Sequence, residues 1–226
     1  PPVLHHRDRN GDDRQRIEKH PAYVEMERIG FGELAMAAMS HRPALGLDKP
    51  VPHAAKYAIQ YLFAQSEFGL LCPISMTDAL TRTIRRYADP ALVDRYLAGL
   101  TAETLEEHIQ GAMFMTERAA GSDVGATVTR AVPDGDGWRL YGDKWFCSNT
   151  DAGLALLLPR DLPDGSHNAY RIVRLKDKLG TRSMASGEIT LEGARAWMVG
   201  PAGQGFVQMA EMVNQSRLSN AVRAAG

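Results

Sequence analysis

Two short segments of the chain carry residue types suited to binding a flat polar ligand. The first, Met115-Thr116-Glu117-Arg118-Ala119-Ala120-Gly121-Ser122-Asp123, places two hydroxyls on either side of a turn of small residues. Such a turn lets backbone N–H groups approach an anionic or heteroaromatic ligand. The second, Lys144-Trp145-Phe146-Cys147-Ser148-Asn149, predicts a short strand with two aromatic rings, a thiol and a hydroxyl. Together they predict a surface for a flat ring and a cradle for its phosphate tail.

These segments resemble the flavin-binding signature of the acyl-CoA dehydrogenase family, which usually reads M/V-T-E-P-x-A-G-S-D and then W-I-T/S. Two later segments agree with it. Lys178-Leu179-Gly180-Thr181-Arg182-Ser183 resembles the family's K-L-G-x-R-S strand, and Gly203-Gln204-Gly205-Phe206 resembles its G-x-G-F start of the last helical domain. Four matches in the right order form a specific signal, whereas one alone is weak.

One branch of the family is most similar to this chain. Arg118 stands where most members carry Pro. This departure, Trp145-Phe146 and the run of residues 174–188 resemble the alkylation-response (adaptive-response) branch. Members of the family bind FAD, and their dehydrogenation of an acyl-CoA needs a held flavin, a polarised thioester and a carboxylate base.

The resemblance implies roles for the residues of the two segments. Thr116 would hydrogen-bond a flavin carbonyl or N3–H, and Gly121 and Ser122 would hold the pyrophosphate, with Ser122 also touching the acyl-CoA. Trp145 would pack on the ring, beside Phe146. The strand with Met113 and Met115 would line the pyrimidine edge, and Cys147 or Ser148 would stand near N5. The alternatives are a strand-end Thr, a plain turn and aromatic core packing.

The chain offers no nameable catalytic base. Arg217 matches the family's arginine beside the acyl-binding cavity, and Asn214 lies one helical turn before it. One subgroup carries its catalytic Glu directly before this arginine, but here that residue is Ser216. The family does not use Glu117 as a base, and Glu211 is expected to be an exposed helix charge.

Composition narrows the classes of function. The 226 residues carry a net charge of −1, which gives no global attraction to nucleic acid or to acidic membranes. Two distant cysteines do not support a disulfide framework or a zinc site, and no third ligand stands near His5-His6, so no metal site is expected. No run of eighteen apolar residues predicts a membrane span, and the start of the chain lacks a signal-peptide core. The expected setting is the cytoplasm.

Apolar periodicity predicts an α+β protein with three parts. Residues 1–110 comprise a polar arm or loop (1–20) and a helical bundle, residues 111–200 form an antiparallel β sandwich or barrel, and residues 201–226 begin a second bundle. Five helices are expected: one from Pro21, two after Pro52 and Pro73, and those at 91–100 and 101–110. The expected strands are 111–115, 127–132, 138–141, 144–147, 154–158, 169–175, 187–191 and 194–199.

Three alternatives remain open for function. The first is α,β-dehydrogenation of a short or branched acyl-CoA by an FAD-binding homo-oligomer, a dimer or tetramer. The second is a flavin-bound, DNA-associated protein of the alkylation-damage response, with a flavin oxidase of small nitro compounds as a third reading. The basic stretch 171–182 forms either a solvated sheet face or a phosphate-binding stripe. Compared with the family pattern, residues are expected to be missing after Leu158 and after Gly226.

Overall fold

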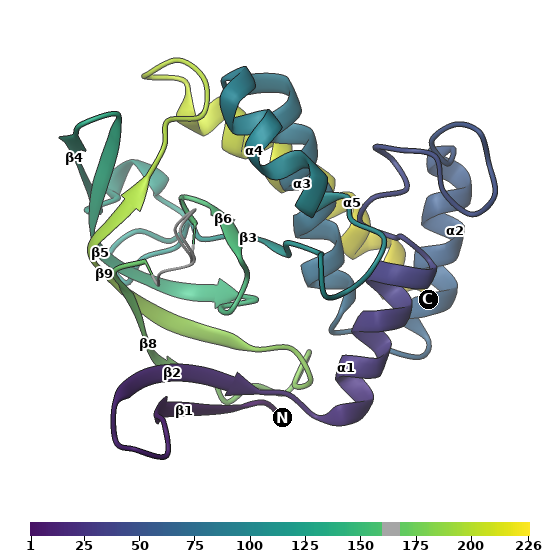
Figure 1. The fold of residues 1–226 in the computed structure, drawn as a ribbon, viewed down its shortest axis with the longest axis horizontal. Helices are drawn as coiled ribbons and strands as arrows, with labels where there is room; N and C mark the ends of the chain where they lie inside the picture. Colours follow the sequence, from purple (N-terminus) through teal and green to yellow (C-terminus); the bar gives the residue numbers. More distant parts are fainter. Residues whose placement is uncertain (160–167) are drawn as a thin grey trace. The chain divides into compact units, whose positions relative to one another are not determined.

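The computed structural model describes residues 1–159 and 168–226, which divide into two compact units. The β unit joins Pro1–His20 to Ala112–Met198, and the helical unit joins Pro21–Gly111 to Val199–Gly226 (Figure 1). Each unit is therefore built from two separate stretches of the chain. No helix of the described residues is long and apolar enough to cross a membrane.

Prolines start most helices of the helical unit. Its elements are α1 (Pro21–Glu27), continued by the π-helical η1 (Arg28–Glu33), α2 (His53–Ala64), α3 (Leu71–Tyr87), α4 (Pro90–Leu100) and α5 (Gly205–Ala225). Proline suits the first helical turn because backbone N–H groups there have no acceptor within the helix, so the N–H that proline lacks is not needed. Pro52 precedes α2, and Asp89 caps α4 by accepting a hydrogen bond from the Ala91 N–H at 2.9 Å. The four helices expected up to residue 100 are confirmed.

The helix expected at 101–110 is wrong, because this segment folds back on α4. The Thr101 hydroxyl donates to the Leu97 carbonyl at 2.8 Å and so ends α4 instead of starting a new helix. The Ile109 N–H then donates to the Gly99 carbonyl at 2.8 Å. Gly99 permits this approach, since a Cβ there would lie 2.5 Å from the Ile109 side chain.

The helix expected after residue 200 is present as α5, but three of its large apolar residues are exposed. Phe206, Val207 and Leu218 are 65%, 62% and 51% exposed, whereas Gln208, Met212 and Ser219 are buried. Three polar residues spaced four apart, Glu211, Gln215 and Ser219, all contact α2 or α3. This set, the α5 polar row, holds α5 in the helical unit.

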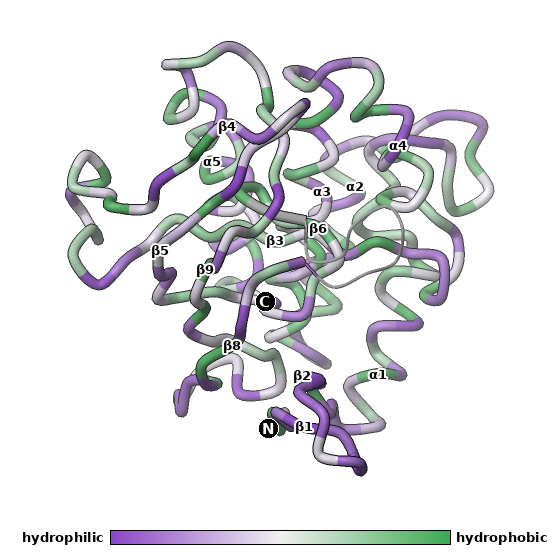
Figure 2. The backbone as a smooth tube through the Cα atoms, turned by 60° about the vertical axis from the view of Figure 1, so that its left-hand side comes forward, coloured by the Kyte–Doolittle hydropathy of each residue, from purple (hydrophilic) through white to green (hydrophobic). Residues whose placement is uncertain are grey.

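The expected arm of residues 1–20 is instead an antiparallel hairpin of β1 (Val3–Arg7) and β2 (Asp13–Glu18). The hairpin is mostly hydrophilic (Figure 2), so no apolar alternation marks it in the sequence. Gln15 joins it to the β unit: its amide donates to the Ile172 carbonyl and accepts from the Ile172 N–H, both at 2.7 Å. A side-chain amide thus replaces a backbone ladder.

Two antiparallel sheets form the rest of the β unit. Their orders are β4-β5-β9-β8 and β3-β6-β7, where β4 is Arg130–Asp134, β5 Gly137–Ser148, β9 Ser186–Ala196, β8 Tyr170–Leu175, β3 Gly111–Met113, β6 Leu154–Leu156 and β7 Leu158–Pro159. The antiparallel arrangement is confirmed, and the expected turn at 133–137 joins β4 to β5.

Two pairs of expected strands are continuous. Residues 138–141 and 144–147 both lie in β5, and 187–191 continues through Ala194 and ends at Ala196 in β9. Gly142 and Gly193 interrupt the alternation, with φ of 147° and 98°. The register shifts beside them, because glycine absorbs a bulge that other residues would resist. Gly193 is the extra residue of a bulge, whereas Gly142 stays paired with Leu191, so neither glycine ends its strand.

Candidate functional site

The two motif segments lie side by side in the β unit. The Trp145 N–H donates to the Thr116 carbonyl at 2.9 Å, and the Lys144 ammonium donates to the Met115 carbonyl at 3.2 Å. Residues almost thirty positions apart in the chain are therefore neighbours in the fold. The side-by-side arrangement is what a shared ligand surface requires.

Glu117 is the buried anchor of the first segment. Its carboxylate accepts from the Lys144 ammonium at 2.6 Å, from the Val128 N–H at 2.7 Å and from the Thr129 hydroxyl at 2.5 Å. Burial opposes the charged form, yet these hydrogen bonds and the nearby ammonium outweigh it and lower the pKa of Glu117 to about 2. A carboxylate with this pKa does not take up a proton near neutral pH, so Glu117 organises the site rather than acting as a base.

The sheet is bulged on both sides of Glu188. In β5, Lys144 pairs with Ile189 and Cys147 with Gly187, so that Trp145 and Phe146 together oppose Glu188. In β8, Ile172 pairs with Ile189 and Arg174 with Glu188, which leaves one residue extra. Bulges re-aim side chains and occur often beside active sites.

Three cations surround the indole of Trp145. The Lys176 ammonium lies 3.5 Å from the ring centroid, and the guanidinium carbons of Arg118 and Arg174 lie at 5.4 and 5.9 Å. Glu188 holds two of them, with Arg174 at 2.8 Å and Lys176 at 2.6 Å. The neighbouring Phe146 is 61% exposed. We call this group the Trp145 platform; it comprises Trp145, Phe146, Arg118, Arg174 and Lys176.

Polar groups of the first segment remain open beside the platform. Gly121 and Ser122 are exposed, and a Cβ on Gly121 would meet no other atom within 4 Å. Met113, Met115 and Thr116 are half-buried. Among the described residues the Thr116 and Ser122 hydroxyls make no hydrogen bond, so both donors are free for a ligand.

Cys147 and Ser148 lie deeper in the sheet. Cys147 is fully buried, and burial raises the pKa of its thiol to about 12, which removes it as a nucleophile. Ser148 is half-buried, with its hydroxyl oxygen 3.5 Å from that of Ser186. Of the two, Ser148 alone keeps part of its surface exposed.

Most basic side chains of the stretch 171–182 form an ion pair with an acidic side chain or a hydrogen bond with a hydroxyl. Arg171 pairs with Glu192 at 3.1 Å, and Lys178 donates to the Ser186 hydroxyl at 2.7 Å, while Glu188 holds Arg174 and Lys176. Paired charges favour the solvated sheet face over a phosphate-binding stripe. A pocket of about 220 Å³ on this side is lined in part by Lys176, Lys178 and Arg182.

The substrate residues expected on the last helix lie on α5 in the helical unit. Asn214 and Arg217 are exposed, and Ser216 has a buried hydroxyl without a partner among the described residues. Glu211 is not the expected exposed charge: it bonds Arg82, Arg86 and Tyr87. The hydrogen bond from Tyr87, helped by those of the two arginines, lowers the pKa of Glu211 to about 2.

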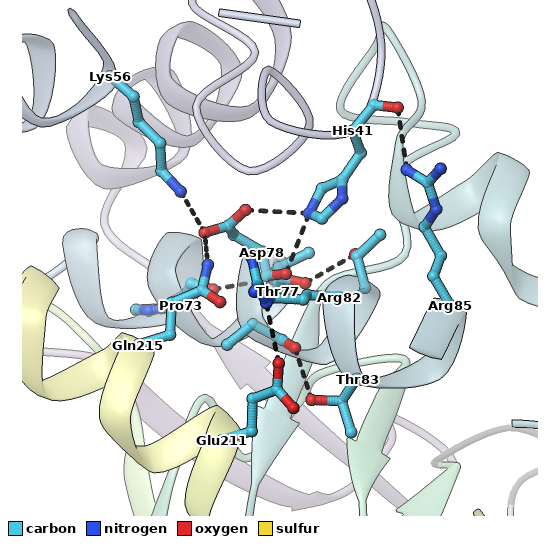
Figure 3. A network of polar contacts seen from close by, with 12 residues as sticks. His41, Lys56, Pro73, Thr77, Asp78, Arg82, Thr83, Arg85, Glu211 and Gln215 are labelled. Carbon is cyan, nitrogen blue, oxygen red and sulfur yellow. Dashed lines mark hydrogen bonds and ion pairs between the residues drawn. The ribbon is translucent and has the colours of Figure 1, made fainter. Parts of the chain in front are cut away.

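A buried charge cluster in the helical unit has no counterpart in the sequence-based predictions (Figure 3). Asp78 of α3 pairs with Lys56 of α2 and accepts from Gln215 of α5, and His41 Nε2 lies 3.0 Å from its Oδ1. Lys56 and Asp78 are almost fully buried. The one sequence signal is a lysine within the apolar stripe of α2. Among the described residues no group of three or more His, Cys, Asp or Glu side chains forms a metal site.

The described residues form a helical unit and an antiparallel β unit. In the β unit, Trp145 and Phe146 of the second motif segment lie beside the first motif segment. This combination defines the class of acyl-CoA dehydrogenase-like proteins. Residues 1–107 match the adaptive response protein AidB N-terminal domain, and residues 112–194 match the acyl-CoA dehydrogenase middle domain. The chain belongs to the acyl-CoA dehydrogenase family, in the branch that contains AidB.

Individual relatives agree with this assignment. AidB of Escherichia coli (strain K12) is 35% identical over 98% of this chain and 44% of its own length, and acyl-CoA dehydrogenase family member 11 of Caenorhabditis elegans is 33% identical over 80% and 34%. The crystal structure of Caenorhabditis elegans ACDH-11 in complex with C11-CoA superposes with a TM-score of 0.87 at 28% identity, covering 98% of this chain and 42% of that one.

The chain thus spans less than half the length of these relatives. The match to the Escherichia coli protein extends over 244 aligned positions, more than the 226 residues of this chain. The relative therefore carries extra residues within the matched range. The sequence comparison with the family pattern predicted that residues are missing after Leu158. This position borders residues 160–167, which lie outside the described residues.

Proposed function

We propose that this chain forms part of an FAD-dependent dehydrogenase that introduces a double bond between the α and β carbons of a short or branched acyl-CoA. The observation that carries the proposal is the bond from the Trp145 N–H to the Thr116 carbonyl. It joins the two motif segments into one surface, with an aromatic wall on one side and free hydroxyls on the other. The family assignment and the C11-CoA complex of the relative support acyl-CoA as the class of substrate.

The residues present fit a flavin. Thr116 offers an unpaired hydroxyl to the polar edge of the ring, with Met113 and Met115 lining that edge, and the exposed Gly121 and Ser122 offer an N–H and a hydroxyl to the pyrophosphate. Trp145 and Phe146 supply the ring-packing surface, and Cys147 and Ser148 back it. When bound, FAD accepts the hydride of the reaction, while these residues bind and orient it.

The substrate side is less complete. We propose that Ser122, Asn214 and Arg217 contact the acyl-CoA, because each offers an exposed donor. No described residue is assigned as the base: Ser216 has no carboxylate, and the low pKa of Glu117 keeps it charged in its ion pair with Lys144. Both cysteines are free, which suits a reducing compartment such as the cytoplasm, and a homodimer or homotetramer is the proposed assembly.

The first test is the absorption spectrum of the purified protein, before and after addition of FAD. A bound flavin should show a shifted visible band, and Thr116→Val and Trp145→Ala should each weaken FAD binding by at least about tenfold, or about 1.4 kcal/mol. Arg139→Gln, which alters a half-buried position of β5 away from the two motif segments, is the control. Bleaching by butyryl-CoA or isobutyryl-CoA tests dehydrogenation. Absence of FAD binding would refute the proposal for this protein.

A second candidate is a flavin-bound protein associated with DNA. The match of residues 1–107 to the adaptive response protein AidB N-terminal domain favours it, while the paired charges of 171–182 do not. Binding of labelled duplex DNA that weakens steeply with added salt would support this candidate. A flavin oxidase of small nitro compounds remains a third reading, tested by nitroethane-dependent oxygen uptake.

A further inference from the structure

The Trp145 platform carries more positive charge than its acids balance. Lys176, Arg174 and Arg118 all lie within 6 Å of the indole centroid, and the one carboxylate recorded in contact with them in the described chain is Glu188. The protein as a whole has a net charge of −1, so this excess is local.

Arg118 is the cation of the platform that lacks an acid. Arg174 and Lys176 are both held by Glu188, whereas the exposed Arg118 forms no ion pair with any described residue. Its one recorded partner is the ring of Trp145. A guanidinium stacked on an indole is held in place by the ring quadrupole but keeps its full charge for a third group.

The position of this charge decides what it can act on. The guanidinium carbon of Arg118 lies over the indole, 5.4 Å from its centroid, so its charge is close to a ring held beside Trp145. Gly121 and Ser122, three and four residues further along, offer the backbone N–H and the hydroxyl for a phosphate tail. An unpaired cation at the ring level favours a ring that carries negative charge.

We propose that Arg118 makes the Trp145 platform selective for an anionic planar ring, so that the protein binds reduced flavin more tightly than oxidised flavin. The inference rests on the proposed function. Addition of two electrons and one proton turns the neutral oxidised ring into an anion, and Arg118 stabilises that anion more than the neutral ring. Arg118 is therefore a residue that sets the flavin's reduction potential, with no part in proton or hydride transfer.

The test compares the protein with Arg118→Gln and with Arg130→Gln as the matched control. Arg130 is also an exposed arginine of the β unit over an aromatic ring, 6.0 Å from the centroid of Tyr141, but it does not contact Trp145. Each protein is titrated with FAD and with riboflavin, and the midpoint potential of bound FAD is measured during reduction with dithionite and solvent protons.

Arg118→Gln should lower the affinity for reduced relative to oxidised FAD by about tenfold, which is about 30 mV for a two-electron couple. Affinity for oxidised FAD should stay within about twofold, and Arg130→Gln should change neither. An unchanged potential overturns the inference while leaving the proposed function intact. Weaker binding of oxidised FAD with unchanged riboflavin binding would place Arg118 on the phosphates and also overturn it.

A measurement without flavin separates the two ideas further. The unpaired charge should draw iodide to Trp145. Arg118→Gln should therefore lower the iodide quenching of the fluorescence that Trp145→Phe removes, relative to its quenching by neutral acrylamide, whereas Arg130→Gln should leave this ratio unchanged. An unchanged ratio in Arg118→Gln would overturn the inference. If the protein binds no FAD, the proposed function fails, and the quenching comparison still decides whether Arg118 presents an uncompensated charge.

Discussion

Individual residues of the motif have two different tasks. The polar groups of three residues are open: Thr116, Gly121 and Ser122. The Glu117 carboxylate instead accepts hydrogen bonds from four groups of the protein, including the Thr129 N–H at 3.2 Å. The same short segment thus contains open polar groups, which the proposed function assigns to the ligand, and the carboxylate that anchors the segment. A carboxylate inside a motif is therefore not evidence of acid–base chemistry.

Lys144→Met tests the anchor directly. Lys144 and Glu117 are both about 2% exposed in their side chains, so the substitution leaves an uncompensated buried carboxylate. We expect the free energy of unfolding to fall by about 3–5 kcal/mol, measured by urea denaturation. The exposed Lys49→Met should stay within about 0.5 kcal/mol. A loss below about 1 kcal/mol for Lys144→Met would mean that the pair is not buried in solution.

The pH dependence of stability has a defined direction. The pKa of Glu117 is lowered from an ordinary 4.5 to about 2, so its charged form stabilises the fold above pH 4.5. This stabilisation is lost as the pH falls from 4.5 through 2. Glu117→Gln should flatten the fall in the urea midpoint across this window. Because Glu211 titrates in the same range, part of the fall should remain; an unchanged curve would contradict the assignment.

At the scale of elements, bulges rather than regular strands build the site. The row of Glu188 carries one bulge on β5 and one on β8, and these direct Trp145 and the two basic side chains to a common place. Gly187 makes the row possible, because a Cβ there would lie 2.8 Å from the Arg174 carbonyl oxygen. The geometry of the platform thus depends on a residue with no side chain.

Gly187→Ala should therefore damage the site. Since the clash is with backbone, we expect a loss of about 1–3 kcal/mol in stability and weaker FAD binding, by calorimetry and flavin titration. Gly180→Ala is the matched control, because a Cβ at Gly180 meets nothing within 4 Å. Equal behaviour of the two variants would show that the strands can shift without cost.

The helices of the helical unit are joined by polar contacts as well as by an apolar core. Asp78 links α2, α3 and α5 through Lys56 and Gln215 (Figure 3). In addition, the Ser219 hydroxyl donates to the Gln60 side-chain oxygen at 3.1 Å. Burial opposes the charge on Asp78, but His41 and Lys56 hold its pKa below the usual range. The α5 polar row explains why this helix stays in place with its large apolar residues exposed.

Asp78→Asn should destabilise the helical unit strongly. The amide keeps the shape but leaves the Lys56 ammonium buried without an opposite charge, so we expect a loss of about 3 kcal/mol or more. Asp94→Asn, at an exposed position of α4, should have little effect. Thermal unfolding followed by circular dichroism measures both, and equal midpoints would contradict the role given to the cluster.

At the scale of the whole molecule, the chain spans less than half the length of its relatives, and under the proposed function its described residues form one wall of a flavin site. We expect weak FAD binding unless a second copy or further polypeptide covers the ring. If a second copy does so, the apparent dissociation constant should fall about tenfold, or about 1.4 kcal/mol, as protein concentration passes the dimerisation range. Sedimentation at the same concentrations provides the assembly state. A constant affinity across that range would exclude completion by a second copy.

Local signals in the sequence predicted the family, the order of helical and β segments, and every expected helix except the one at 101–110. The motif segments were recognised because their glycines, hydroxyls and aromatic residues are close together in the sequence. The polar hairpin β1–β2 gave no such signal, since its place is secured by Gln15 and Ile172, which are far apart in the chain.

Tertiary structure alone decided which charges meet. The sequence contains the basic stretch and the acids but no rule that pairs Glu188 with Lys176, Glu117 with Lys144, or Asp78 with Lys56. Those pairs depend on strand register, bulges and helix packing, which bring distant residues together. The periodicity of apolar residues indicates which face of a helix or strand is buried. An ion pair also depends on the helix or strand that supplies the opposite charge, and only the folded chain shows which one that is.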